Sequence, residues 1–273
     1  MERPAWAPQG IDLNVPSVSR MYDYYLGGSH NFEIDRETAR RAIDAWPGLP
    51  RIMQANRAFM RRAIRFAVSE GIGQFLDIGS GIPTFGNVHE VARGLDQDAR
   101  VVYVDNDPVA VAHSRAVLEG DPKTGIVSAD FRSPQDILES PEVESLLDLR
   151  KPVALMLVAL LHFIEDRDEP RKTIADLARE LAPGSLLIVS HGSADNAPRR
   201  DGGSALRKVY ESASAPLIAR SQDEIAPFFE DFEMIDPGLV PLSRWRPDNP
   251  SEQEDTAVLA GVAGVGRKAG LSG

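Results

Sequence analysis

The stretch Phe75-Leu76-Asp77-Ile78-Gly79-Ser80-Gly81 carries the clearest structural signal in the chain. Residues 74–78 predict a buried strand that ends in an acid, and two glycines spaced by one residue follow it. Because glycine has no Cβ, a turn built on Gly79 and Gly81 can be tight and lets a ligand approach the backbone closely. A turn that leads into a helix also presents free backbone N–H groups. The motif therefore predicts a ligand-binding turn at the carboxyl end of this strand.

A nicotinamide dinucleotide is one candidate ligand for such a turn, and the sequence disfavours it. Dinucleotide-binding turns usually continue as G-x-G-x-x-G, whereas Thr84 occupies the third glycine position. The carboxylate of Asp77 would also repel a pyrophosphate. A ligand with an ammonium and a sulfonium, and no phosphate, would tolerate or prefer that acid. The alternative without a ligand is that Asp77 caps a helix and the glycines only form a turn.

Two further acids follow predicted strands. Asp105 stands 26 residues after Gly79, at the end of the strand predicted over 100–104. A carboxylate at that edge can accept both hydroxyl hydrogens of a ribose, while Asn106 or a neighbouring acid caps the next helix. Asp130, followed by Phe131, ends the strand predicted over 125–128. It can take an adenine amino group while an adjacent backbone N–H contacts a ring nitrogen.

The order of elements after residue 72 predicts the fold class. Apolar runs at 74–78, 100–104, 125–128, 153–158 and 185–190 alternate with helical patterns at 87–94, 108–119, 133–147 and 169–181. Such repetition predicts a parallel sheet buried on both faces, with right-handed crossovers. Helical stretches at 204–218 and 222–229 precede runs at 232–239 and 256–265, which predict a closing antiparallel pair. We therefore predict an α/β fold: a Rossmann-like seven-stranded, mostly parallel sheet with helices on both faces.

The first seventy residues predict an N-terminal arm and a helical cap without strands. Prolines and a glycine within residues 1–16 indicate an extended arm, and helices are expected near 20–26, 34–45 and 51–69. On the third helix, apolar residues recur every three or four positions. The arginines off that stripe are expected to form a solvated face; they are Arg57, Arg61, Arg62 and Arg65. We place the cap at residues 1–70 and the sheet domain at 71–273, packed as one unit.

The composition argues against several classes of function. The formal net charge of −11 makes the chain a poor candidate for wrapping nucleic acid. Without cysteine there is no disulfide, thiolate nucleophile or cysteine-bound zinc, and the scattered histidines lack metal-ligand spacing, so we expect no metal. The N-terminus lacks a signal-peptide pattern, and no apolar run reaches the roughly 18 residues of a membrane span. We expect a cytoplasmic protein with no membrane partner; the oligomeric state stays open.

These motifs resemble the class I S-adenosylmethionine-dependent methyltransferases over roughly residues 72–265. The D-x-G-x-G turn and the acids after the second and third strands match that superfamily in order and approximate spacing. The stretches Ser19–Gly28, Asn56–Phe59 and Phe75–Glu90 also resemble an actinobacterial family of S-adenosyl methyltransferases long carried as a domain of unknown function. The resemblance implies S-adenosylmethionine as cofactor, with Gly79 and Gly81 lining its methionine part, Asp105 its ribose and Asp130 its adenine.

The residues after the fourth predicted strand bear on the methyl acceptor and on the catalytic residue. Methyltransferases of nucleobase amines are similar to one another in carrying an Asn/Asp-Pro-Pro-aromatic run here, whereas this chain has Leu160-Leu161-His162-Phe163. That departure favours a small-molecule acceptor. His162 is the candidate catalytic residue, as a general base for a hydroxyl or amine, since imidazole titrates near neutral pH. Its alternative role is packing against the cofactor, because methyl transfer needs mainly proximity and alignment.

Together these motifs predict a cofactor site and a reaction. Aromatic side chains of the cap, Tyr22 among them, would either attract a sulfonium or pack on the sheet. The residues expected to contact the cofactor are Tyr22, Asp77, Gly79, Ser80, Gly81, Asp105, Asn106, Asp130, Phe131, Ala159 and His162. We predict methyl transfer to an oxygen or nitrogen nucleophile of a small molecule; the alternative is a non-catalytic binder of S-adenosylmethionine or S-adenosylhomocysteine. A valine at Gly79 is expected to fill the ligand's space and abolish cofactor binding.

Overall fold

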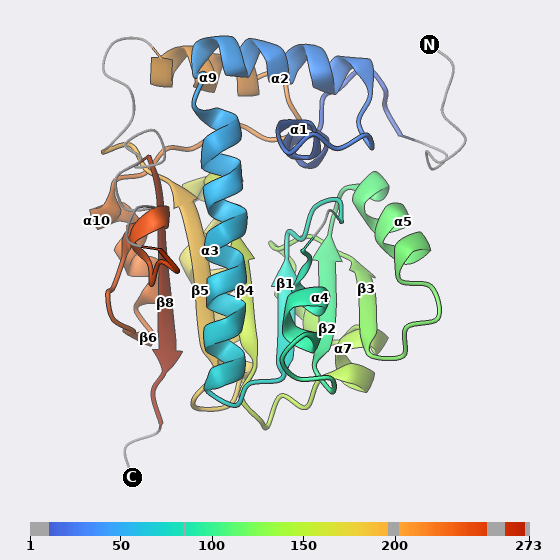
Figure 1. Cartoon of the computed structure of the whole chain (residues 1–273), viewed down its shortest axis with the longest axis vertical. Helices are drawn as coiled ribbons and strands as arrows, with labels where there is room; N and C mark the ends of the chain where they lie inside the picture. The colour runs from blue at the N-terminus through green and yellow to red at the C-terminus, as the bar shows by residue number, and fades with distance from the viewer. Residues whose placement is uncertain (1–10, 84–85, 196–201, 250–259, 271–273) are drawn as a thin grey trace.

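One mixed sheet organises the chain, with strand order β3-β2-β1-β4-β5-β8-β6 (Figure 1). The computed structural model describes residues 11–83, 86–195, 202–249 and 260–270. The parallel strands are β1 (Gln74–Ile78), β2 (Arg100–Asp105), β3 (Thr124–Ser128), β4 (Ala154–Val158) and β5 (Leu186–Gly192). β8 (Gly261–Lys268) runs antiparallel to β5 and pairs with β6 (Phe232–Met234) and the short β7 (Val240–Pro241). The predicted Rossmann-like sheet is confirmed, and β7 is its eighth strand.

The closing antiparallel pair is present with different bounds. Phe232 lies opposite Lys268, because β8 continues to 268, three residues beyond the predicted end at 265. β6 ends at Met234 instead of 239, because Pro237 has no backbone N–H for a ladder and Gly238 turns the chain with a φ of +85°. The part of the second predicted run over 256–259 lies outside the described residues.

Helices cover both faces of the sheet. α3 (Leu49–Ser69), α4 (Val88–Arg93) and α5 (Pro108–Val117) pack on one face. α6 (Pro134–Leu138), α7 (Pro141–Leu146), α8 (Pro170–Glu180) and the 3-10 turn η3 (Ala226–Phe229) pack on the other. Strand residues alternate between the two cores: Phe75 faces the α3 side and Leu76 the α8 side. No helix in the described part of the chain is long and apolar enough to cross a membrane.

Two predicted helices differ from the observed ones for local reasons. The helix expected over 133–147 is split into α6 and α7, because Pro141 cannot donate to the preceding turn and Ser140 caps the new helix. The helical stretch expected over 204–218 is α9 (Gly202–Tyr210), which ends early. There Ser212 Oγ donates to the carbonyl of Val209 at 2.9 Å, a side-chain bond that competes with helix continuation.

A cap lies across the carboxyl ends of the parallel strands (Figure 1). It contains α1 (Val18–Tyr25) and α2 (Glu33–Ala45), and α9 packs against α2. The cap therefore draws one helix from the second half of the chain, and α3, which was assigned to it, runs along the sheet. The arm predicted over 1–16 falls partly outside the described residues, and the division at residue 71 stays a prediction.

The four arginines of α3 that were predicted to form a solvated face are buried or half-buried. Arg62 is only 4% exposed and donates to the carbonyls of Leu242 (2.6 Å) and Trp245 (2.8 Å). That prediction was wrong because the turn η4 (Leu242–Arg244) packs on α3 beside the sheet. The apolar stripe alone did not reveal a second covered face.

A buried ionic network fastens the cap to the loop after β2. Asp35 is fully buried, and its carboxylate accepts hydrogen bonds from Arg20 Nε (2.8 Å), the backbone N–H of Phe32 (2.8 Å) and that of Ser17 (2.9 Å). Asp107 joins the network, since Ser17 Oγ donates to its carboxylate and Arg20 Nη1 lies 3.6 Å from the same oxygen. The position of the cap is thus coupled to the end of β2.

We expect Asp35→Ala to destabilise the protein by about 3–5 kcal/mol, because it leaves the buried Arg20 guanidinium without its carboxylate. The measurement is urea unfolding followed by circular dichroism. Glu33→Ala is the matched control on the same helix, since Glu33 pairs with Arg36 at the surface, and it should change the free energy of unfolding little. Equal effects of the two substitutions would contradict the importance of the network.

Candidate functional site

The first of two adjoining cavities lies at the carboxyl ends of β1, β2 and β4, where the strand order reverses. Its volume is about 1080 Å³. Eight of the predicted site residues line it: Tyr22, Asp77, Gly79, Ser80, Gly81, Asp105, Asn106 and Ala159. Residues that the sequence reasoning did not assign also line it, among them Asn56, Arg57 and Arg132. The strand-end pattern therefore located this cavity, whereas the contributions of α3 were missed.

The glycine turn after β1 shapes the floor of this first cavity. Gly79 and Gly81 both have positive φ, +74° and +66°, which disfavours any other residue. A Cβ at Gly79 would lie 2.7 Å from Leu160 Cδ1, so Gly79 permits the loop after β4 to approach the turn. A Cβ at Gly81 would meet no protein atom within 4 Å. A valine at 79 would therefore collide first with Leu160, and Gly81 is the position whose side chain would enter open space.

The carboxylate of Asp105 holds the turn in place. Its Oδ2 accepts the backbone N–H of Gly81 at 2.7 Å, and its Oδ1 accepts that of Asp107 at 2.8 Å. Asp107 itself caps α5 by accepting from the backbone N–H of Val109 and Ala110. The division of labour predicted for these acids is thus seen, with Asp107 as the cap and Asp105 at the cavity wall.

The third predicted acid, Asp130, lies beside the first cavity instead of lining it. Its carboxylate accepts hydrogen bonds from Arg132 (2.7 and 2.9 Å) and from Asn106 Nδ2 (2.9 Å). The hydrogen bond with Arg132 is the main reason that the pKa of Asp130 falls to about 2. Phe131 is buried in the core on the α8 side. From this segment it is Arg132 that reaches the cavity wall.

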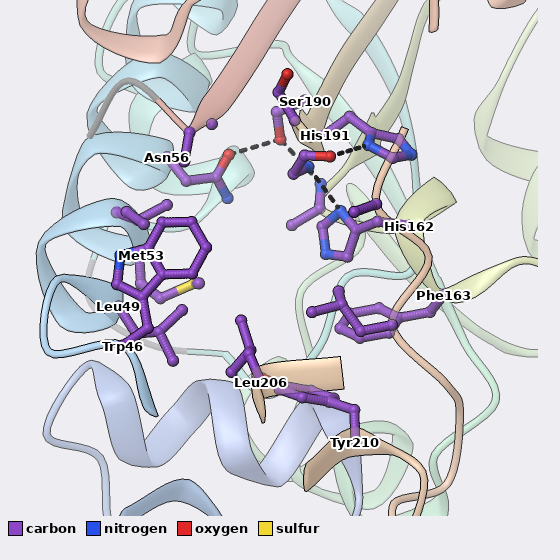
Figure 2. A pocket seen from close by; sticks show the side chains of 18 of the residues that line it. Trp46, Leu49, Met53, Asn56, His162, Phe163, Ser190, His191, Leu206 and Tyr210 are labelled. Carbon is purple, nitrogen blue, oxygen red and sulfur yellow. Dashed lines mark hydrogen bonds between the residues drawn. The ribbon is translucent and has the colours of Figure 1, made fainter. Parts of the chain in front are cut away.

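The second cavity, of about 900 Å³, lies between the cap and the sheet (Figure 2). Its walls are mainly apolar and come from segments far apart in sequence; they include Trp46, Leu49, Met53, Phe163, Leu206, Tyr210 and Leu217. His162 lines this second cavity and is not part of the first. Sequence reasoning predicted only Tyr22, Ala159 and His162 here, because no local pattern marks walls assembled from such distant segments.

The two cavities share a wall. Val18, Tyr22, Asn56, Ala159 and Phe163 line both. Ala159 has a left-handed backbone with φ of +58°, a conformation that costs a non-glycine residue about 1–3 kcal/mol and recurs at functional sites. Its N–H is held by the carbonyl and the hydroxyl of Ser190, at 3.2 and 2.9 Å. The end of β4 is thus bent into the junction between the cavities.

A chain of hydrogen bonds crosses this junction. Ser190 Oγ donates to Asn56 Oδ1 at 2.6 Å (Figure 2), and Asn56 Nδ2 donates to the Tyr22 hydroxyl at 2.9 Å. The chain links β5, α3 and α1. It therefore fixes the cap relative to the sheet at the point where the two cavities meet.

Two histidines lie together at the end of the second cavity (Figure 2). The backbone N–H of Gly192 donates to His162 Nδ1 at 3.3 Å. His191 contacts the carbonyl of Gly192 through Nδ1 (2.7 Å) and Arg220 Nη1 through Nε2 (3.0 Å). Burial, together with the charge of Arg220, lowers the pKa of His162 well below its ordinary value, and burial lowers that of His191 to about 4. The near-neutral titration expected of His162 therefore does not apply to this half-buried ring.

Comparison with known proteins identifies the family. A family model described as S-adenosyl methyltransferase matches residues 4–269. The chain belongs to this family. The methyltransferase is similar to two solved structures over almost its full length. One is a protein of Thermobifida fusca YX described as a methyltransferase, at 39% identity, with 98% of this chain and 100% of that chain covered and a TM-score of 0.91. The other is a DUF574 family protein of Streptomyces avermitilis MA-4680, at 36% identity, with 94% and 99% covered and a TM-score of 0.88.

More distant likeness extends to the fold alone. Human N-acetylserotonin methyltransferase is 14% identical, with 82% of this chain and 57% of that chain covered and a TM-score of 0.50. None of the curated proteins matches the methyltransferase. S-adenosylmethionine is the cofactor of the family, as the resemblance of the motifs implied, and the nicotinamide alternative is set aside.

The electrostatics of the first cavity fit a cationic cofactor. Asp77 is only 6% exposed, and burial raises its pKa to about 7, while Arg57 lowers it and Asp105 raises it. Burial also raises the pKa of Asp105 to about 6, against the lowering effect of hydrogen bonds from backbone N–H groups, chiefly those of Asp107 and Gly81. Two neighbouring dehydrated carboxyl groups favour a ligand that carries positive charge. S-adenosylmethionine has an ammonium and a sulfonium, so its positive charges complement these two carboxyl groups.

We expect Asp77→Asn to stabilise the ligand-free methyltransferase above neutral pH. The folded pKa of about 7 exceeds the unfolded value of 3.8, so the unfolded state binds fewer protons and stability falls as pH rises between these values. The substitution removes this loss, which amounts to roughly 2–4 kcal/mol at pH 8 and disappears near pH 4. Thermal unfolding across pH measures it, with the exposed Asp231→Asn as control. A constant difference at every pH would refute the assignment.

Proposed function

We propose that the methyltransferase binds S-adenosylmethionine in the first cavity and a small, largely apolar acceptor in the second. A methyl group would then pass to an oxygen or nitrogen nucleophile of the acceptor. The observation that carries this proposal is the shared wall, because Tyr22, Asn56 and Ala159 line both cavities. Ligands bound in the two cavities would therefore lie next to each other at these shared residues. Methyl transfer chiefly requires such proximity and alignment of the two reactants.

In this proposal the first cavity binds the cofactor along the strand ends. The turn of Gly79, Ser80 and Gly81 would contact the methionine part, whose positive groups would face Asp77. Arg57, which lines this cavity, would receive the methionine carboxylate. Asp105 would take the ribose hydroxyls.

The adenine end of the cofactor would lie toward Asn106 and Arg132, which line the cavity next to Asp130. The predicted contact of Asp130 would therefore act through these two neighbours, whereas the side chain of Phe131 lies in the core and would not reach the cofactor. Tyr22 and Ala159 would face the sulfonium end, where the two cavities meet.

The second cavity would bind and orient the acceptor. When bound, the cofactor supplies an electrophilic methyl group at the junction. The apolar side chains of Trp46, Met53 and Leu206 would exclude water and align an acceptor of matching shape. Proteins that share the fold include human N-acetylserotonin methyltransferase, and a small acceptor would agree with a cavity of this size.

We expect Gly81→Ala to weaken binding of S-adenosylhomocysteine by about tenfold or more, since the new methyl group enters the first cavity. Gly120→Ala is the matched control: Gly120 also has a positive φ and open space, in the turn before β3. Both substitutions should cost about 1–2 kcal/mol of stability through backbone strain. Calorimetry measures the affinities, and equal loss of affinity in both variants would refute the cofactor site.

A methyl-labelling experiment tests the reaction. The wild-type protein, incubated with isotopically labelled S-adenosylmethionine and a small-molecule extract, should label an extractable apolar product. Met53→Trp should abolish labelling, because the larger ring fills the second cavity, while calorimetric binding of S-adenosylhomocysteine stays unchanged. Labelling that survives in Met53→Trp would contradict the acceptor site. Cofactor binding without labelling of any extract would favour the non-catalytic alternative.

A further inference from the structure

The tautomer of His191 follows from its two partners. Its Nδ1 lies 2.7 Å from the carbonyl oxygen of Gly192, which can only accept a hydrogen bond. Its Nε2 lies 3.0 Å from Arg220 Nη1, which can only donate. His191 is therefore neutral, with its proton on Nδ1. The charge of Arg220 is balanced on its other side by Asp166, at 2.6 Å.

The tautomer of His162 follows in the same way. The group that faces its Nδ1 is the backbone N–H of Gly192, at 3.3 Å, which can only donate. Nδ1 must then carry the lone pair, and the proton of the neutral ring sits on Nε2. Figure 2 shows that this second nitrogen points into the open middle of the cavity. His162 thus presents an N–H to the acceptor, and a general base there would need the opposite tautomer.

The direction of the hydrogen bonds at the junction gives a second donor. In the structure Ser190 Oγ accepts the N–H of Ala159 and donates its own hydrogen to Asn56 Oδ1. This fixes the Asn56 amide with Nδ2 toward Tyr22, whose oxygen accepts it. The hydroxyl hydrogen of Tyr22 then remains to be donated, from a side chain that lines both cavities. Burial raises the pKa of Tyr22, which keeps it protonated.

Among the described residues, no other ionisable group around the second cavity is a competing base. The described lining contains no aspartate, glutamate or lysine. Its charged side chain is Arg207, and its other ionisable residue besides those above is Tyr210, which bonds Tyr25 and whose pKa is raised to about 12. Two donors, a bound sulfonium and apolar walls are a setting that favours an anionic oxygen.

We propose that the acceptor is an acidic phenol or enol that binds as its anion, with the oxygen held by the Nε2–H of His162 and the hydroxyl of Tyr22. This inference rests on the proposed function and names its substrate class. The acceptor releases its proton to solvent before or during binding. Transfer then forms an O–CH₃ bond from an oxygen lone pair and breaks the S–CH₃ bond, whose electron pair stays on sulfur. Two opposite charges are neutralised, and no protein group takes up a proton.

Dyes that change spectrum on ionisation test this without turnover. The protein would be saturated with sinefungin, which has an ammonium in place of the methylsulfonium and cannot transfer methyl. Either 4-nitrophenol or 7-hydroxycoumarin would then be titrated, and the absorbance of the ionised form followed against pH. We expect the pKa of the bound dye to fall by about one unit or more, which corresponds to a tenfold preference for the anion.

The variants separate a donor from a base. His162→Gln keeps an N–H donor and cannot act as a base, so it should retain most of the shift in dye pKa, whereas His162→Leu and Tyr22→Phe should each lose most of it. Thermal unfolding and circular dichroism confirm that each variant is folded. Once a substrate is known, His162→Gln should also retain far more turnover than His162→Leu.

The outcomes distinguish the two proposals. A dye that binds in its neutral form, or a shift that both His162→Leu and Tyr22→Phe leave unchanged, overturns the anion inference while the acceptor cavity stands. If the protein binds sinefungin but neither dye, the result counts against the acceptor cavity and overturns the inference with it. Equal loss in His162→Gln and His162→Leu shows that donation from position 162 is not the decisive property, and overturns it as well.

Discussion

The carboxylate of Asp105 is the interaction on which the site depends, because it joins three parts of the molecule. It accepts the backbone N–H of Gly81 and so sets the glycine turn after β1. It also accepts the N–H of Asp107, whose carboxylate is bonded to the cap through Ser17 and lies close to Arg20. The floor of the first cavity, the end of β2 and the roof above both cavities are therefore placed by one short segment. A shift in any of them would move the others.

This arrangement has an energetic cost that is consistent with its function. Asp77 and Asp105 are buried close together, and burial raises both pKa values. A domain selected only for stability would place apolar residues there. The protein instead keeps two carboxyl groups that a cationic ligand would stabilise, so part of the free energy lost in the ligand-free fold is recovered on binding. The left-handed backbone of Ala159 is a second local cost, at the junction between the two cavities.

Sequence reasoning succeeded where the signal was local and failed where the structure was assembled from distant segments. The glycine turn and Asp105 were predictable because a strand end and its following turn lie within a few residues of each other. The second cavity was not, since α1, α3, α9, the segment after β4 and the end of β5 each supply part of its wall. The buried Arg62 shows the same limit: a helical pattern reveals one apolar stripe, and nothing in it indicates that η4 covers another face.

His162 illustrates why residue type alone does not give a chemical role. The sequence places a histidine after β4, and its ordinary titration suggests a base. In the fold, the N–H of Gly192 occupies one ring nitrogen and burial keeps the ring neutral, so the nitrogen that faces the cavity carries hydrogen. Gly192 belongs to β5 and is thirty residues away along the chain. The orientation of Tyr22 is likewise set by Asn56 and Ser190, from α3 and β5. The chemistry offered to an acceptor is thus determined by backbone and side-chain partners that only the folded sheet and cap bring together.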